Sequence, residues 1–204
     1  MVFRQVTHDD LGCASYLIGD EHAGVAAVVD PKLDIDEYLR LARYVGVSIE
    51  HILETHNHAD HVSGHGRLAA ATGARIHVHR IAEAGYEHEP FEDGWELELG
   101  RVRVRALHTP GHRPEHTAFA LIDTGRGGES AVARYVVGVR VGLEHVLDRD
   151  AEVAREVQIL VDVEPRIDDG RDPGVVVADQ IGGAAEIIVG DLSKDHASYL
   201  PRTG

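Results

Sequence analysis

The chain has 204 residues, with 20 Lys and Arg against 35 Asp and Glu, which gives a formal net charge of −15. This balance argues against partners that need clustered cations, so we expect neither a nucleic-acid nor a membrane partner. The single cysteine, Cys13, excludes an internal disulfide and a thiolate-rich metal site. No apolar leader follows Met1 and no apolar run approaches the roughly 18 residues of a membrane span, so we expect a cytoplasmic protein.

The first part of the chain alternates between strand and helix patterns. A helix is predicted from Asp34, which has the spacing of a capping box with Glu37, to Gly46, which is placed to end it. A small-residue helix is predicted at 66–72, and alternation around Gly100 predicts a β-hairpin. The predicted strands are 13–18, 25–29, 47–53, 75–79, 95–99, 102–106 and 116–122. Strands that alternate with helices indicate an α/β fold.

The pattern changes after the Gly125-Arg-Gly-Gly128 break. Beyond it we predict strands at 135–141, 175–178 and 186–189 and a helix at 150–161. We therefore divide the chain into an N-terminal half, residues 1–128, and a C-terminal segment, residues 129–204, whose fold the pattern does not define.

Histidine is concentrated in one third of the chain. Eleven of the 15 histidines lie between His51 and His116. Imidazole is the commonest metal ligand. A chain rich in His and Asp but nearly free of Cys points to a nitrogen and oxygen site for iron, zinc or manganese.

The segment His56-Asn-His-Ala-Asp-His61 carries the strongest metal signal. Two imidazoles two residues apart, in a loop after a predicted strand, can converge on one ion. His112 follows the rigid Thr109-Pro-Gly111 segment at the end of another strand, from where it can face the first pair. Such a site keeps a position open in which a metal lowers the pKa of water or polarises a substrate. Surface or capping roles would suit one of these histidines but not the whole set.

Both segments resemble the metallo-β-lactamase superfamily. Further similarity in Leu11-Gly-Cys-Ala-Ser-Tyr-Leu17, Glu54-Thr-His-Asn-His-Ala-Asp-His-Val-Ser-Gly-His65 and His108-Thr-Pro-Gly-His-Arg-Pro-Glu-His-Thr-Ala-Phe119 is to its persulfide dioxygenase and glyoxalase II branch. Within that branch the segments look closest to bacterial members often fused to rhodanese domains. The resemblance covers residues 1–128 and implies an αββα sandwich, with the metal site at one edge between two sheets.

The resemblance also implies a ligand set. His56, His58 and His112 match one metal site, and Asp60 and His61 match the second site of the dinuclear hydrolases or orient the first. We assign Asp60 as the candidate catalytic carboxylate. In the iron dioxygenases one Fe(II) sits on the positions of His56 and His112 and on a carboxylate from a later Gly-Asp motif. The implied cofactor is one Fe(II) ion, or one or two Zn(II) ions.

Three functions follow from this resemblance. The first is a persulfide dioxygenase acting on glutathione persulfide or a similar thiol persulfide, and the second is a glyoxalase II-type thioester hydrolase. The third is an inactive remnant that binds metal weakly. A separate rhodanese-type sulfur-transfer protein and a second copy of this chain are the candidate protein partners.

The C-terminal segment departs from the family pattern. No Gly-Asp lies between His112 and Asp150, and no later Pro-Gly-His follows. The nearest substitute is Gly190-Asp191 with His196, and a loop or capping role suits Asp191 better than a metal role. Either the segment is a divergent second half of the sandwich, or a rearranged or shifted reading frame has replaced the true one. The abrupt end of the match favours the second.

Expectations for five further side chains follow from the sequence. We expect Trp95 to pack in the core and His77 and His79 to be exposed to solvent. Arg113 and His116 flank the second metal segment and are candidates to contact a substrate thiol or carboxylate.

Overall fold

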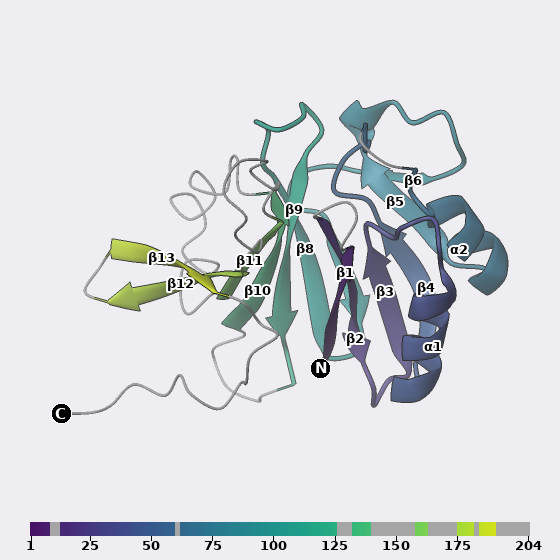
Figure 1. Cartoon of the computed structure of the whole chain (residues 1–204), viewed down its shortest axis with the longest axis horizontal. Coiled ribbons are helices and arrows are strands. Elements are labelled where there is room, and N and C mark those ends of the chain that lie inside the picture. The colour runs from purple at the N-terminus through teal and green to yellow at the C-terminus, as the bar shows by residue number, and fades with distance from the viewer. Residues whose placement is uncertain are drawn as a thin grey trace.

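Two β-sheets lie face to face, with helices on the outer side of one of them (Figure 1). The computed structural model describes residues 1–8, 13–59, 62–125, 132–139, 158–162, 175–181 and 184–190. No helix among these residues is long and apolar enough to cross a membrane.

The first sheet has six strands in the order β1-β2-β3-β4-β5-β6. They are β1 (Val2–His8), β2 (Cys13–Asp20), β3 (Val25–Val29), β4 (Ser48–Leu53), β5 (Arg75–His79) and β6 (Glu89–Phe91). The first three strands are antiparallel neighbours, whereas β3 to β6 run parallel. The carboxyl ends of β3 and β4 therefore meet at one edge, which is where parallel sheets carry their sites.

Helices α1 (Asp36–Val45) and α2 (His65–Thr72) cover one face of this sheet (Figure 1). Both end at a left-handed glycine, Gly46 for α1 as predicted and Gly73 for α2. The predicted capping box is wrong. Because α1 begins at Asp36, Glu37 stands one position too early to complete the box and pairs instead with Lys32 at 3.4 Å.

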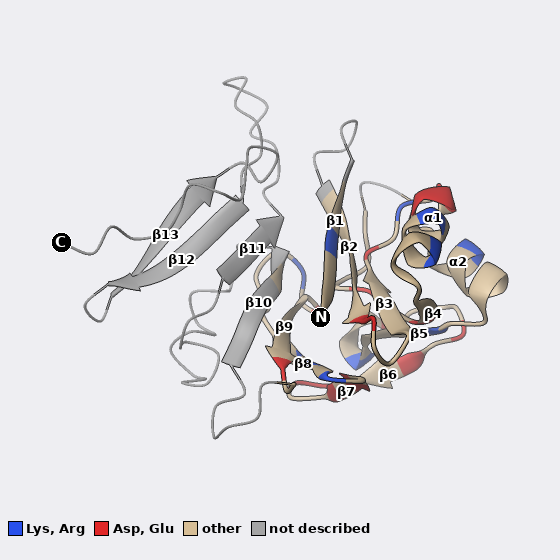
Figure 2. Ribbon diagram, turned by 90° about the horizontal axis from the view of Figure 1, so that it is seen from below, with Lys and Arg blue, Asp and Glu red and all other residues tan. Residues whose placement is uncertain are grey.

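The second sheet has the order β11-β10-β9-β8-β7. Its strands are β7 (Glu96–Leu99), β8 (Val102–His108), β9 (Thr117–Asp123), β10 (Val132–Val139) and β11 (Gln158–Asp162). The predicted hairpin is confirmed as β7 and β8, in which Nε of Arg103 lies 2.7 Å from Oε1 of Glu98. Acidic and basic residues both occur along these two strands (Figure 2). Two further strands, β12 (Val175–Ile181) and β13 (Ala184–Gly190), pair antiparallel with each other. They contain the strands predicted at 175–178 and 186–189.

The helix predicted at 150–161 is wrong at its end. Residues 158–161 lie in β11, which pairs parallel with β10, and residues 151–157 lie outside the described residues. A short apolar run fits a buried strand as well as a helix, and pairing with a neighbouring strand decides between them.

Two apolar layers hold the structure together. Between the sheets pack Tyr16, Ile18, Leu53, Phe119 and Leu121, and Trp95 is partly buried against them as expected. Between the first sheet and the helices pack Leu17, Val28, Tyr38, Ile52 and Leu68. Neighbours on β2 and β4 contribute to opposite layers, because successive side chains of a strand point to opposite faces. The described elements thus form a helix–sheet–sheet sandwich.

One ion pair joins the sheets at the end far from the carboxyl edge of β3 and β4. Arg101, in the turn between β7 and β8, approaches the last residue of β2, with its Nε 3.0 Å from Oδ2 of Asp20. The side chain of Asp20 is 1% exposed, and its hydrogen bonds to Arg101 hold the pKa of this carboxyl well below its usual range.

Candidate metal centre

The two histidine segments meet at the carboxyl edge of the first sheet. The loop after β4 carries His56 and His58, and the turn between β8 and β9 carries His112. The backbone N of Thr117 donates to the backbone O of Thr55 at 2.9 Å, which joins the two segments across the sheets. The sequence prediction that these segments face each other is confirmed.

Four imidazole rings gather at this junction. The ring centre of His56 lies 4.2 Å from that of His58, 4.8 Å from that of His112 and 5.5 Å from that of His116. His112 and His116 are 6.3 Å apart. Since His116 is fully buried, it belongs to the base of this cluster.

Neighbouring groups fix which nitrogen of each ring faces the cluster. The Thr55 hydroxyl donates to Oδ2 of Asp30 at 2.7 Å, so its oxygen accepts from Nδ1 of His56, also at 2.7 Å. Nδ1 of His116 donates to the carbonyl of Thr109 at 3.0 Å. In these bonds Nδ1 is the donor atom of both rings. In metal sites, histidine ligands are oriented by a hydrogen bond of this kind, made by the ring nitrogen that does not bind the metal.

Asp30 contacts both Thr55 and His58 and so links the residues that surround the cluster. It follows β3, is 6% exposed and has a φ of 48°, a left-handed conformation that Asp tolerates better than most residues. Its Oδ1 accepts from the backbone N of Thr55 at 2.7 Å and lies 3.3 Å from Nε2 of His58. Burial acts to raise the pKa of Asp30, but the neighbouring His58 and the Thr55 hydrogen bond outweigh it and lower the pKa.

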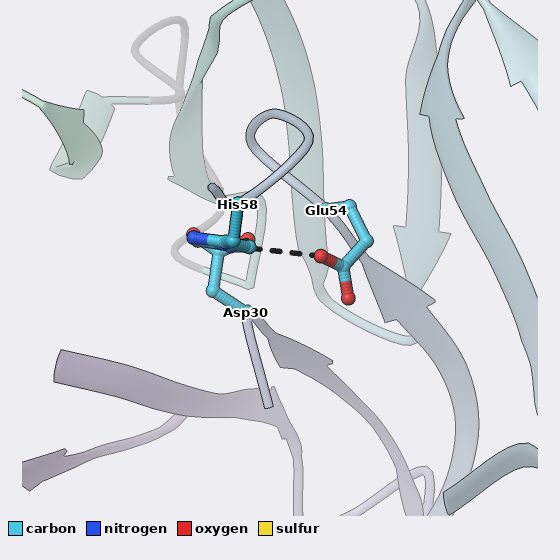
Figure 3. A group of neighbouring side chains, drawn as sticks. All are labelled: Asp30, Glu54 and His58. Carbon is cyan, nitrogen blue, oxygen red and sulfur yellow. Dashed lines mark ion pairs between the residues drawn. The ribbon is translucent and has the colours of Figure 1, made fainter. Parts of the chain in front are cut away.

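A second buried carboxylate, Glu54, faces the same nitrogen of His58. Its Oε2 lies 3.6 Å from Nε2 of His58, and its Oε1 accepts from the Ser63 hydroxyl at 2.7 Å and lies 3.3 Å from Nδ1 of His65. Figure 3 shows Asp30, Glu54 and His58 converging from the ends of β3 and β4 and from the loop beyond. Within the described part of the chain, this is the one set of three metal-binding side chains with all ligand atoms within 4.8 Å of one another.

The carboxylates of this set can act in two ways. They can bind an ion together with Nε2 of His58, or they can accept its N–H and leave Nδ1 for a metal. The oxygens of Asp30 and Glu54 also accept hydrogen bonds from Thr55 and Ser63, which hold both carboxylates in place beside His58. A carboxylate behind a histidine ligand is a common arrangement at metal sites.

Two imidazoles of the cluster, those of His56 and His116, are held neutral, as metal ligands must be. Burial lowers the pKa of His56 to about 4, and the neighbouring histidines act in the same direction. Burial also lowers the pKa of His116. His56, His58 and His112 thus bring imidazole donors from two segments to one place, although the set whose ligand atoms all lie within 4.8 Å of one another is Asp30, Glu54 and His58.

Some predicted residues fall elsewhere. Asp60 and His61 lie outside the described residues, as do Asp191 and His196 and the side chain of Cys13. The expectation that His77 and His79 are exposed is wrong, since they are 2% and 4% exposed. β5 is covered by the second sheet on one face and by helices on the other, so polar side chains there are buried too.

Sequence reasoning missed Asp30 and Glu54 as parts of the site. Asp30, in Val29-Asp-Pro-Lys-Leu33, and Glu54, at the start of the histidine motif, lie in segments that resemble the family, but the sequence analysis gives neither of them a role in the site. Both directly follow parallel strands, a position that points to a site once the strand order is known. Strand order was the missing information.

The sequence comparison agrees with this geometry. Residues 8–176 match the metallo-beta-lactamase superfamily, and the chain belongs to that superfamily. The fold, described above as a helix–sheet–sheet sandwich, is the fold of this superfamily.

Two of the curated relatives carry the names of different enzyme activities. Hydroxyacylglutathione hydrolase of Rhodospirillum rubrum is 36% identical over 51% of this chain and 41% of its own length. Persulfide dioxygenase ETHE1 of Bos taurus is 29% identical over 60% of this chain and 49% of its own length. The crystal structure of ETHE1 from Myxococcus xanthus has a TM-score of 0.67 and 24% identity, covering 84% of this chain and 78% of that one. The chain thus spans less than half the length of these two curated relatives.

The family match continues past residue 128, where the motif resemblance ends. It extends to residue 176, and β10 and β11 continue the second sheet beyond that point.

Proposed function

We propose that the protein is a metal-dependent enzyme that acts on the sulfur of a small thiol-derived substrate, and that it oxidises a thiol persulfide. The observation that carries the proposal is the meeting of the His56, His58 and His112 imidazoles from two segments, with the Thr55 hydroxyl accepting from His56 and Asp30 lying 3.3 Å from His58. A site prepared in this way serves a metal ion.

The residues of this chain have separate tasks in the proposal. His56, His58 and His112 hold the ion, and Asp30 orients the first two rings. When bound, the metal supplies an open coordination position that polarises substrate or activates water or oxygen. The iron dioxygenases take a further carboxylate ligand from a Gly-Asp motif, for which Asp191 is the nearest substitute in this sequence, although a loop or capping role suits Asp191 better.

The persulfide assignment is supported by the motif resemblance of residues 54–65 and 108–119 and by the bovine relative named persulfide dioxygenase. The substrate class is then a small persulfide such as glutathione persulfide. A single Fe(II) is the metal that this chemistry requires.

A thioester hydrolase is the second candidate. It is supported by the 36% identity to a hydroxyacylglutathione hydrolase and by Asp60 and His61, which provide the ligands of a second ion in the dinuclear motif. Zinc at one or two positions would suit this reaction, because zinc lowers the pKa of bound water.

Elemental analysis of protein purified without added metal, combined with two activity assays, tests the proposal. We expect about one iron per chain and oxygen consumption that requires glutathione persulfide. Two zinc ions with hydrolysis of S-lactoylglutathione would establish the alternative. A chain without metal or activity would be the inactive remnant. The H56A/H112A variant is the control, and activity that survives both substitutions would refute the site assignment.

A further inference from the structure

Glu115 connects the two segments that carry the proposed metal ligands. It lies in the turn between β8 and β9, three residues after His112, and is 3% exposed. Its Oε1 accepts from the backbone N of Asn57 at 3.1 Å and from Nε of Arg113 at 3.1 Å. One oxygen therefore binds both segments.

The two partners of Glu115 are direct neighbours of metal ligands. Asn57 lies between His56 and His58, and Arg113 follows His112. The Asn57 side chain also donates to the backbone O of Ala82 at 2.8 Å, so the loop is held on its other side as well. A movement of the Glu115 carboxylate would be transmitted to the histidines of both segments.

The hydrogen bond between Glu115 and Asn57 is a second contact between the two segments, and it affects how the segments are placed relative to each other. The hydrogen bond from Thr117 to Thr55 fixes one point of the junction. Glu115 adds a contact at Asn57, two residues after Thr55 in one segment and two residues before Thr117 in the other. Two separated contacts fix both the distance and the angle between the two segments, and the affinity of the site for metal depends on both.

Burying the Glu115 carboxylate costs free energy, and its hydrogen bonds offset this cost. Burying a charge is unfavourable unless it is hydrogen-bonded, and charge-assisted bonds are about twice as strong as neutral ones. Burial acts to raise the pKa of Glu115, and the hydrogen bonds from Asn57 and Arg113 help to lower it below its usual value. An alanine would leave the Asn57 N–H without this acceptor.

We propose that Glu115 is a positioning residue that sets the distance and angle between the His56–His58 loop and the His112 turn, and thereby the affinity of the site for metal. This inference rests on the proposed metal site. It assigns a function to a residue that is not itself one of the proposed ligands.

Asp20 offers a matched comparison within the same fold. Like Glu115 it is a buried carboxylate that joins the two sheets, and it binds the backbone N and Nε of Arg101, both at 3.0 Å. It lies at the opposite end of the sandwich from the histidines. Loss of Asp20 should therefore lower stability without changing the metal site.

The test compares E115A, E115Q and D20N with the parent chain. Affinity for Zn(II) is measured on metal-free protein by competition with a chromogenic chelator, and thermal unfolding is measured on the same samples. We expect E115A to lose roughly ten- to a hundredfold in affinity, the range typical of residues behind metal ligands. E115Q keeps an acceptor oxygen and should recover most of that loss, whereas D20N should lower the unfolding temperature and keep the parent affinity.

Each contrary result has a distinct meaning. E115A with the parent affinity for zinc would overturn the role of Glu115 alone. A parent chain that binds no zinc would overturn the proposed site and this inference together. If E115A does not fold, E115D takes its place, because its carboxylate is one methylene shorter and draws the oxygen back from Asn57. A lower unfolding temperature in E115D with the parent zinc affinity would reduce Glu115 to a structural contact.

Discussion

Asp30 holds Thr55 with both carboxylate oxygens, accepting from its backbone N and from its hydroxyl at 2.7 Å each. The hydroxyl in turn accepts from His56, and Asp30 itself reaches His58. One buried carboxylate at the end of β3 thus orients two imidazoles on the loop after β4. The strained backbone of Asp30, with a φ of 48°, is maintained by these bonds.

Replacing Asp30 with Asn tests this relationship at nearly constant shape. Asn also accepts a left-handed backbone, but its amide group turns a donor toward Thr55 or His58. We expect D30N to lose roughly ten- to a hundredfold in Zn(II) affinity by chelator competition. We also expect it to lose about 2 kcal/mol of unfolding free energy in urea. D36N, at an exposed position of α1, is the control, and a D30N protein with parent affinity would remove Asp30 from the site.

Thr55 makes two kinds of bond that can be tested separately. Its backbone N donates to Asp30, and its hydroxyl forms a relay that links Asp30 to His56. T55V keeps the backbone N–H to Asp30 and the shape of the side chain but removes the group that bridges Asp30 and His56. We expect a loss of about tenfold in Zn(II) affinity, the lower end of such effects. T55S restores the hydroxyl and should bind zinc as the parent does. Equal affinities of T55V and T55S would show that the relay does not orient His56.

Gly64 lets the chain after the histidine motif pass close to Asp30. Its backbone N donates to the carbonyl of Pro31 at 2.7 Å, and an added Cβ would overlap the carbonyl of Lys32. We expect G64A to lose about 1–3 kcal/mol of unfolding free energy, as overpacked sites do. Gly66 is the matched control, because a Cβ there meets nothing within 4 Å. Since Ala favours helices, G66A should gain up to about 1 kcal/mol, and a neutral G64A would contradict the close packing.

The parts of the site that are local in sequence could be predicted, and the parts that depend on strand order could not. His56, His58 and His112 lie in short motifs whose spacing is visible in the chain. Asp30 and Glu54 become neighbours only because β3 and β4 run parallel with α1 between them. A capping box and a helix near 158–161 were mispredicted for a related reason, since tertiary packing chose among patterns that local sequence left open.

The buried pair of His51 and His77 lies apart from the proposed ligands and links pH to stability. Nδ1 of His51 lies 2.9 Å from Nε2 of His77, on neighbouring strands β4 and β5. Nδ1 of His77 lies 3.5 Å from the exposed Glu89. Burial lowers the pKa of both histidines, that of His77 from 6.5 to about 4. Both rings are therefore neutral in the folded protein at pH 7.

Acidification should destabilise the fold through His77. Below pH 6.5 the unfolded chain takes up a proton that the folded chain rejects until about pH 4, so stability falls as the pH drops through this window. For one such histidine the loss between pH 7.5 and pH 5 is roughly 2 kcal/mol. H77Q should show a correspondingly smaller difference between urea unfolding curves at these two pH values, even if it is less stable at both. H22Q, at an exposed histidine, should keep the parent difference. An unchanged pH dependence in H77Q would place the acid sensitivity elsewhere.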